Sequence, residues 1–176
     1  MWKQWKSRLR RKFPGIQFVL FQAGSVDDKQ IARFLKPADL SIRIVKEKIY
    51  DGIQCCDAVI TTSGTATLEV AILGIPMVIV YKVTPITYLI GRLLVNIPFI
   101  GLPNIVAGRK IVQELIQYRA TPDAIADETG RILSDRKYAA EMSRQLREVK
   151  TRLGEGGGIE RLATVAARML TEPAIE

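Results

Sequence analysis

The stretch Ala58-Val-Ile-Thr-Thr-Ser-Gly-Thr-Ala-Thr-Leu-Glu-Val-Ala-Ile-Leu-Gly-Ile-Pro-Met-Val-Ile-Val-Tyr81 carries the pattern that decides the fold. Its first four residues, 58–61, form a short β-branched run that predicts a strand. Residues Thr65–Leu73 favour a helix, and Gly74 is placed to end it. Met77–Tyr81 is a second apolar strand, so the stretch predicts two parallel strands joined by a right-handed helical crossover.

Two further strands are predicted before this unit. Ile16–Phe21 is an apolar run of strand length, and Leu40–Val45 alternates as a half-buried strand does. Helices are expected at Trp2–Lys12, at Asp28–Leu35 with Ser25 or Asp27 as cap, and at Ile49–Cys55. The alternation predicts an α/β fold with a Rossmann-like parallel sheet and helices on both faces.

After Pro85 the pattern turns helical. Gly154–Gly158 is expected to be a flexible elbow between the last two helices. We expect one domain over residues 1–176, with 134–176 as a C-terminal helical extension. The predicted helices are Ile86–Val95, Lys110–Tyr118, Pro122–Leu133, Arg136–Arg152 and Ile159–Leu170.

The charge of the chain is concentrated at its N-terminus. The formal net charge is +8, and six cations but no acid lie among the first twelve residues. Three interpretations stay open for this segment: a solvated helix face, a contact with anionic lipid, and a contact with nucleic acid. Trp2 and Trp5, which interleave with the cations, favour lipid over nucleic acid.

Several function classes are excluded by what the sequence lacks. It contains no histidine, no Walker lysine and no clear pair of carboxylates for acid–base catalysis. Cys55 and Cys56 are neighbours without metal-ligand spacing, which fits a reducing cytosol. No signal-peptide pattern follows the basic residues. We therefore expect a cytoplasmic chain that mainly binds, without a metal or cofactor.

The strongest candidate site is the turn after the 58–61 strand. Ligands of open parallel sheets bind beyond the carboxyl ends of strands, where a glycine turn leads into a helix. Gly64 lets backbone amides approach a phosphate, while Ser63 and Thr65 add hydroxyl donors. Glu69 lies one turn after Thr65 and can accept from ribose hydroxyls. The alternative, that these residues merely cap a helix, stays open.

A second candidate is the segment Leu102-Pro-Asn-Ile-Val-Ala-Gly-Arg109, read as a loop that opens a helix. It brings the amide side chain of Asn104, the flexible Gly108 and the cation Arg109 close together in sequence. The guanidinium of Arg109 can bind a phosphate through two hydrogen bonds. The alternative is an ordinary helix-start loop with a surface arginine.

Three segments together closely resemble the C-terminal half of lipid-A-disaccharide synthase. The resemblance extends from about Phe13 to Leu170 and includes Gln113-Glu-Leu-Ile-Gln117, read as part of a helix. It implies the C-terminal half of a GT-B glycosyltransferase fold. The three segments are Cys56-Asp-Ala-Val-Ile-Thr-Thr-Ser-Gly-Thr-Ala-Thr-Leu-Glu69, Gly74-Ile-Pro-Met-Val-Ile-Val-Tyr81 and Leu102-Pro-Asn-Ile-Val-Ala-Gly-Arg109.

The resemblance implies an inverting hexosyltransferase of lipid A biosynthesis. Such an enzyme moves 2,3-diacylglucosamine from UDP-2,3-diacylglucosamine to lipid X through a β-1,6 link. It needs neither metal nor cofactor. The implied nucleotide site has the Ser63–Gly64–Thr65 turn on the diphosphate and Glu69 on the ribose, completed by Asn104, Gly108 and Arg109.

The family's N-terminal half, which carries the proposed catalytic base and most of the acceptor site, is not among these residues. We therefore expect a donor-binding half that is inactive alone and is completed by that half or by a homo-oligomer partner. One alternative is a split or regulatory subunit that binds a nucleotide sugar. Another is a UDP-N-acetylglucosamine 2-epimerase-like protein, which shares the turn and the glutamate but leaves 102–109 unexplained.

The resemblance also implies a peripheral position on the cytoplasmic face of the inner membrane. Pro85–Phe99 corresponds to an apolar segment that helps to handle acyl chains, and plain core packing is its alternative. The apolar region is interrupted by polar residues and prolines, so it is too short for a spanning helix. The candidate membrane or acyl-chain residues are Trp2, Trp5, Tyr88, Leu89, Arg92 and Phe99.

Overall fold

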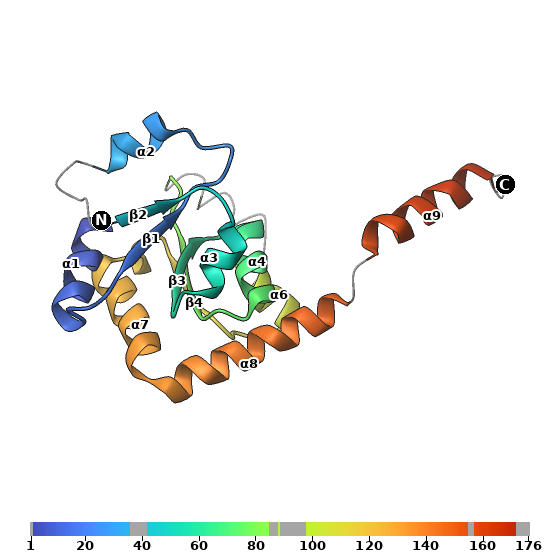
Figure 1. The fold of residues 1–176 in the computed structure, drawn as a ribbon. Helices are drawn as coiled ribbons and strands as arrows, with labels where there is room; N and C mark the ends of the chain where they lie inside the picture. Colours follow the sequence, from blue (N-terminus) through green and yellow to red (C-terminus); the bar gives the residue numbers. More distant parts are fainter. Residues whose placement is uncertain (1, 36–41, 85–87, 89–97, 155–156, 172–176) are drawn as a thin grey trace.

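The computed structural model describes residues 2–35, 42–84, 88, 98–154 and 157–171. It shows parallel strands with helices on both faces, as predicted (Figure 1). Helix α7 packs against the strands from one side with α1 outside it, while α4, α6 and α8 pack together on the other. The helices are α1 (Trp2–Lys12), α2 (Asp28–Phe34), α3 (Ile49–Gln54), α4 (Thr65–Leu73), α6 (Leu102–Ala107), α7 (Pro122–Ser134), α8 (Arg136–Leu153) and α9 (Gly158–Thr171).

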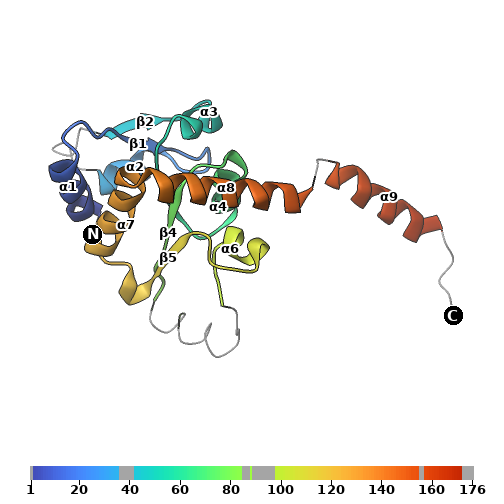
Figure 2. The same ribbon diagram turned by 90° about the horizontal axis from the view of Figure 1, so that it is seen from below.

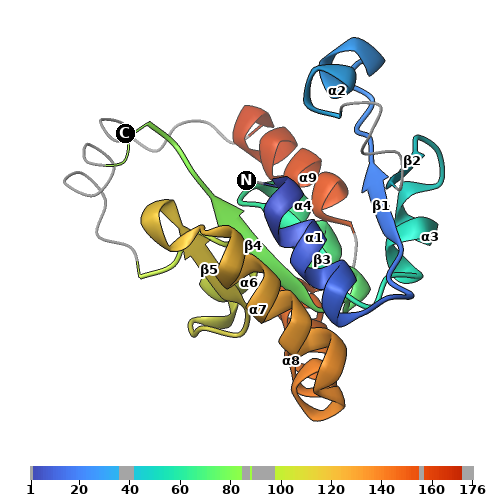
Figure 3. The ribbon, with the colours of Figure 1, turned by 90° about the vertical axis from the view of Figure 1, so that its left-hand side faces the viewer.

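The strands form two parallel sheets instead of the single sheet that the alternation predicts. Strand β1 (Phe18–Phe21) pairs with β2 (Ile42–Val45), and β4 (Met77–Tyr81) lies between β3 (Val59–Thr62) and β5 (Gln113–Ile116). Figure 3 shows β1 and β2 standing apart from the other three strands. Strands β1 and β3 do not pair with each other, so the strands fall into two sheets.

Two predictions between residues 102 and 118 are wrong. The predicted loop 102–109 begins with helix α6, and the predicted helix Lys110–Tyr118 holds strand β5 and a short 3₁₀ turn. The N–H groups of Ile111 and Val112 donate to the side chain of Asn104 instead of starting a helix. Strand β5 then pairs in parallel with β4, its Glu114 opposite Ile79. The predicted helix Ile86–Val95 lies outside the described residues, apart from Tyr88.

The core is centred on β4. Met77, Val78 and Ile79 have no exposed surface. Helix α8 covers this region through a stripe of buried side chains at Met142, Leu146 and Val149, whose spacing is that of one helix face. Thus α8, which was expected to belong to an extension, is part of the packed body.

Helix α9 projects from the body, as Figure 2 shows. It follows the glycine segment, where Gly154 has φ 79°. Its side chains Ile159, Leu162 and Val165 are exposed. At the other end of the chain, α1 packs on α7 through the buried Leu9. No helix within the described ranges is both long and apolar enough to cross a bilayer.

Candidate functional site

The turn between β3 and α4 has the geometry expected at the end of a parallel strand. Strand β3 ends at Thr62, and α4 begins at Thr65. Between them Gly64 has φ 148° and ψ −171°, which side-chain-bearing residues rarely adopt. Apart from its two chain neighbours, no atom of the described residues lies within 4 Å of a Cβ placed on Gly64, so this part of the structure leaves the space over the glycine open. The turn thus leaves room for a group to approach the backbone.

The start of α4 offers donors to such a group. The first N–H groups of any helix have no partner within it, and the helix dipole makes this end partly positive. Thr67 N–H and hydroxyl both donate to the Gly64 carbonyl, at 3.1 and 2.7 Å, which tightens the first turn. Thr65 and Glu69 are exposed and lie one helical turn apart. The structure therefore places these two predicted residues together on an open surface.

Ser63 is held by a contact that the sequence did not predict. Its half-buried hydroxyl donates to the backbone carbonyl of Ile100 at 2.8 Å. This hydrogen bond joins the turn to the segment that leads into α6. Ser63 therefore links the first candidate segment to the backbone just before the second one. A hydroxyl has one hydrogen to donate, so here that of Ser63 is used within the protein.

Glu114 organises the segment that Ser63 contacts. This carboxylate on β5 is buried and accepts from the N–H of Ile100 at 3.0 Å and of Gly101 at 2.9 Å. A Cβ on Gly101 would lie 2.4 Å from Ile79 Cδ1 and 2.9 Å from Glu114 Oε1, so any larger residue here would require these two side chains to shift. Sequence reasoning missed Glu114 as a site residue. Its signal was a single acid within the run 111–116, in which every other residue except Gln113 is apolar.

Asn104 is a buried residue whose polar atoms are all used within the protein. Its oxygen accepts from the N–H of Ile111 at 2.8 Å and of Val112 at 2.9 Å. Its amide donates to the Val112 carbonyl at 3.0 Å and to Glu114 at 2.7 Å. With 0% of its surface exposed, Asn104 holds α6 against β5 in this structure.

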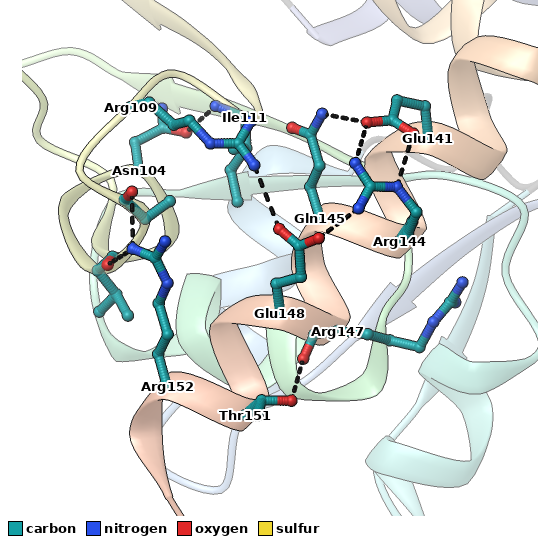
Figure 4. Close-up of polar contacts among 12 residues, drawn as sticks. Asn104, Arg109, Ile111, Glu141, Arg144, Gln145, Arg147, Glu148, Thr151 and Arg152 are labelled. Atoms are coloured by element: carbon teal, nitrogen blue, oxygen red, sulfur yellow. Dashed lines mark hydrogen bonds and ion pairs between the residues drawn. The ribbon is translucent and has the colours of Figure 1, made fainter.

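Gly108 and Arg109 lie at the opposite end of α6 from Ser63. Six helical residues span about 9 Å, because each contributes about 1.5 Å. Gly108 ends the helix with φ 67°. The Arg109 guanidinium donates to Glu148 on α8 at 3.2 Å (Figure 4). The structure therefore does not bring Arg109 to the turn.

Arg109, which follows α6, contacts a cluster of charged residues on the surface of α8 (Figure 4). Arg144 pairs with both Glu141 and Glu148. The hydrogen bond from Arg144, followed by that from Gln145, lowers the pKa of Glu141 to about 2. Arg152 donates to the last carbonyls of α6, at 3.2 Å for Val106 and 2.9 Å for Ala107. The cluster joins α6 to α8.

The membrane candidates are only partly described. Trp5 is half-buried, and its ring meets that of Phe18 edge-on with centroids 6.0 Å apart. Phe99 and Tyr88 are also half-buried. The side chain of Trp2, together with Leu89 and Arg92, lies outside the described residues. Trp5 thus packs from α1 against β1.

The family model and the similar curated proteins indicate the same family. A profile described as lipid-A-disaccharide synthetase matches residues 3–167. A lipid-A-disaccharide synthase of Geobacter sulfurreducens is 47% identical over 163 residues, which cover 93% of this chain and 42% of the relative. One from Nitrosococcus oceani is 37% identical over 149 residues, or 85% of this chain and 38% of the relative.

Solved glycosyltransferases share the fold. A spinosyn forosaminyltransferase aligns with a TM-score of 0.52 and 16% identity, covering 92% of this chain and 38% of its own. A glycotransferase of kitacinnamycin aligns with a TM-score of 0.53 and 17% identity, covering 94% and 38%. These chains show the α/β glycosyltransferase fold, and the partial coverage is consistent with a C-terminal half. The chain belongs to the lipid-A-disaccharide synthase family and spans about two fifths of the length of the relatives it matches.

Proposed function

We propose that this chain binds the diphosphate of a UDP-sugar at the start of α4. The observation that carries the proposal is the open turn at Gly64, which lies at the carboxyl end of β3 and exposes the helix N-terminus. Backbone N–H groups and the positive end of the helix dipole bind phosphate in this arrangement. The hydroxyl of Thr65 adds a donor, and Glu69 accepts from the ribose hydroxyls. No metal or cofactor is part of the proposal.

The proposed donor is UDP-2,3-diacylglucosamine and the proposed acceptor is lipid X. Family membership supports both substrates. Asn104 enters the proposal as a residue that shapes the neighbouring segment. Gly108 and Arg109 stay outside it because they follow the far end of α6, where Arg109 pairs with Glu148. In this proposal, the catalytic base and the acceptor site come from the part of the relatives that this chain does not cover, or from a partner protomer. We therefore expect this chain to bind the donor without transferring the sugar.

Titration calorimetry with UDP and with uridine tests the nucleotide site. UDP is expected to bind more tightly than uridine, since only UDP carries the diphosphate. Thr65→Ala removes a donor to a charged group and is expected to weaken UDP binding by about 1 to 3 kcal/mol, with uridine unaffected. Glu69→Gln is expected to weaken the binding of both UDP and uridine.

Thr151→Ala is the matched control, because that threonine is exposed on α8 and bonds only within its own helix. Equal UDP affinity in the wild type, Thr65→Ala and Thr151→Ala would remove the turn from the site. Measurable transfer to lipid X by the purified chain would contradict the expected inactivity and leave the binding proposal standing.

We also propose a peripheral position on the inner membrane, on its cytoplasmic face. The exposed cations of α1, such as Arg10 and Arg11, support it by their attraction to anionic lipid. Sedimentation with vesicles of phosphatidylglycerol is expected to exceed that with phosphatidylcholine. Exchanging Arg10 and Arg11 for glutamine should reduce the difference. Equal binding to both vesicles would contradict the proposal.

A further inference from the structure

Glu114 is a buried acid in a position that an apolar residue would ordinarily fill. It lies opposite Ile79 of the central strand, and 9% of its surface is exposed. Burying a carboxylate is costly unless hydrogen bonds replace its hydration. Three bonds do so here: from the N–H of Ile100, the N–H of Gly101 and the amide of Asn104. The carboxylate thus defines where the segment before α6 lies.

The Ile100 peptide groups connect this carboxylate with the turn. The N–H of Ile100 donates to Glu114 at 3.0 Å, while its carbonyl accepts from the Ser63 hydroxyl at 2.8 Å. One residue is therefore held on one side by Glu114 and on the other by Ser63. Ser63 directly precedes Gly64, whose backbone forms the open turn. The contacts form one chain from the buried acid to the surface.

The chain of contacts leaves little freedom for the segment that it holds. Gly101 lies so close to the side chains of Ile79 and Glu114 that a Cβ would displace them. Asn104 donates to the same carboxylate oxygen of Glu114 that accepts from Gly101, and it is itself bound to the backbone at Ile111 and Val112. A shift of the Glu114 carboxylate therefore displaces Ile100, and with it the partner of Ser63.

We propose that Glu114 is a positioning residue for the nucleotide turn, acting through Ile100 and Ser63. In this role Glu114 holds Ser63, Ser63 holds the conformation of Gly64, and the start of α4 then faces the diphosphate. Ser63 acts by fixing the turn, and Thr65 is the hydroxyl that donates to the ligand. The inference rests on the proposed function and assigns Glu114 a role in it.

The test is a double-mutant cycle on UDP affinity with Glu114→Gln and Ser63→Ala. Glutamine keeps the size of the side chain, but its single acceptor oxygen cannot replace both carboxylate oxygens. Each single variant is expected to weaken UDP binding roughly 3- to 30-fold. The double variant is expected to bind about as weakly as the weaker single variant, because both substitutions break one chain of contacts.

Gln117→Ala is the matched control. Gln117 is also buried at the end of β5, where its side chain accepts from the Val83 N–H and donates to the Val83 carbonyl, both at 3.0 Å. Its loss is expected to lower the melting temperature without changing UDP affinity, since within the described residues no hydrogen bond leads from Val83 to Ser63. Amide NMR spectra of the free chain add a second readout: Glu114→Gln should move the Gly64 resonance, and Gln117→Ala should not.

The outcomes separate this inference from the proposed function. UDP binding that Thr65→Ala weakens but Glu114→Gln leaves unchanged would overturn the inference alone, as would additive effects in the cycle or an unmoved Gly64 resonance. A wild-type chain that does not bind UDP would overturn the proposed function and this inference together.

Discussion

The two parallel sheets are similarly apolar, yet they are buried to very different degrees. In β4 three consecutive residues, Met77 to Ile79, have no exposed surface. In the smaller sheet Val19 is 38% and Ile44 is 42% exposed. Strand β4 has a strand on each side, whereas β1 and β2 have only each other. Burial here follows from the number of covered edges and faces, and not from composition alone.

The candidate site lies on the well-packed side of this difference. The turn follows β3, which pairs with the buried β4, and the segment that Ser63 contacts is anchored by β5. A site that binds a ligand through backbone groups needs such a support, because small displacements weaken hydrogen bonds. The smaller sheet carries none of the residues proposed to bind UDP.

The largest expected contrast comes from truncating one side chain in each sheet. Ile79→Ala removes a fully buried side chain and should lower the free energy of unfolding by about 2 to 5 kcal/mol. Val19→Ala removes fewer buried atoms and should cost less than about 1 kcal/mol. Urea unfolding followed by circular dichroism measures both. Similar losses would mean that the two sheets are equally important for the core.

Amide hydrogen exchange should sharpen the same comparison without any substitution. Amides of β4 are expected to exchange only through global unfolding, while those of β1 are expected to exchange through local opening. Protection in β4 should exceed that in β1 by roughly tenfold or more. Mass spectrometry of peptides covering 18–21 and 77–81 measures it. Matching protection would show that both sheets open as one unit.

Local patterns account for what could be predicted from the sequence. The β3–turn–α4–β4 unit has the expected order, Gly74 ends α4 with φ 73°, and Asp27 caps α2 with a capping box. Each of these features depends on residues only a few positions apart. The fold class follows from the same local alternation and is confirmed.

Long-range contacts account for what could not be predicted. The sequence predicts a helix where β5 lies, because the amides just before the strand, at 111 and 112, find their partner in Asn104, seven and eight residues earlier. The pairing of Arg109 with Glu148 could not be predicted because the two residues are 39 positions apart in the sequence. Glu114 was overlooked because its three bonds become visible only once α6 rests on β5. No local sequence pattern predicts such pairings.

Helix caps offer a smaller contrast between the two regions. Thr121 caps α7, which packs on β4 and β5, and its hydroxyl accepts from Ala124 N–H at 3.1 Å. Asp27 caps the exposed helix α2 beside the smaller sheet, accepting from Gln30 N–H at 2.7 Å. Thr121→Ala should reduce global stability by about 1 kcal/mol, whereas Asp27→Ala should reduce it less, since α2 can unfold locally.

The urea midpoints of the two cap variants measure these losses of stability. Thr164→Ala on the projecting α9 is a control that is expected to leave the midpoint unchanged. A larger loss from Asp27→Ala than from Thr121→Ala would show that α2 and its sheet belong to the cooperative core. The comparison between the sheets would then have to be abandoned.

The smallest expected effect concerns two exposed ion pairs, one in each region. Glu141 on α8 has its pKa lowered to about 2 by Arg144, and hydrogen bonds from Lys46 and Gln22 lower the pKa of Asp28 on α2. An acid whose pKa is lower in the folded state stabilises the fold above its unfolded value, here 4.5 for Glu141, and this contribution is lost as the pH falls towards 2. Since both pairs are exposed, salt should weaken them.

Thermal melting between pH 6 and about pH 2.5 is the measurement for these pairs. Glu141→Gln should flatten the pH dependence of the melting temperature, because α8 packs on the buried core and melts with it. Asp28→Asn should leave the global transition nearly unchanged, because α2 is tied to the weaker sheet. At high salt both variants should approach the wild type. A pH dependence that responds to Asp28→Asn and not to Glu141→Gln would reverse the order of the two regions, and it would place the cooperative core around β1 and β2.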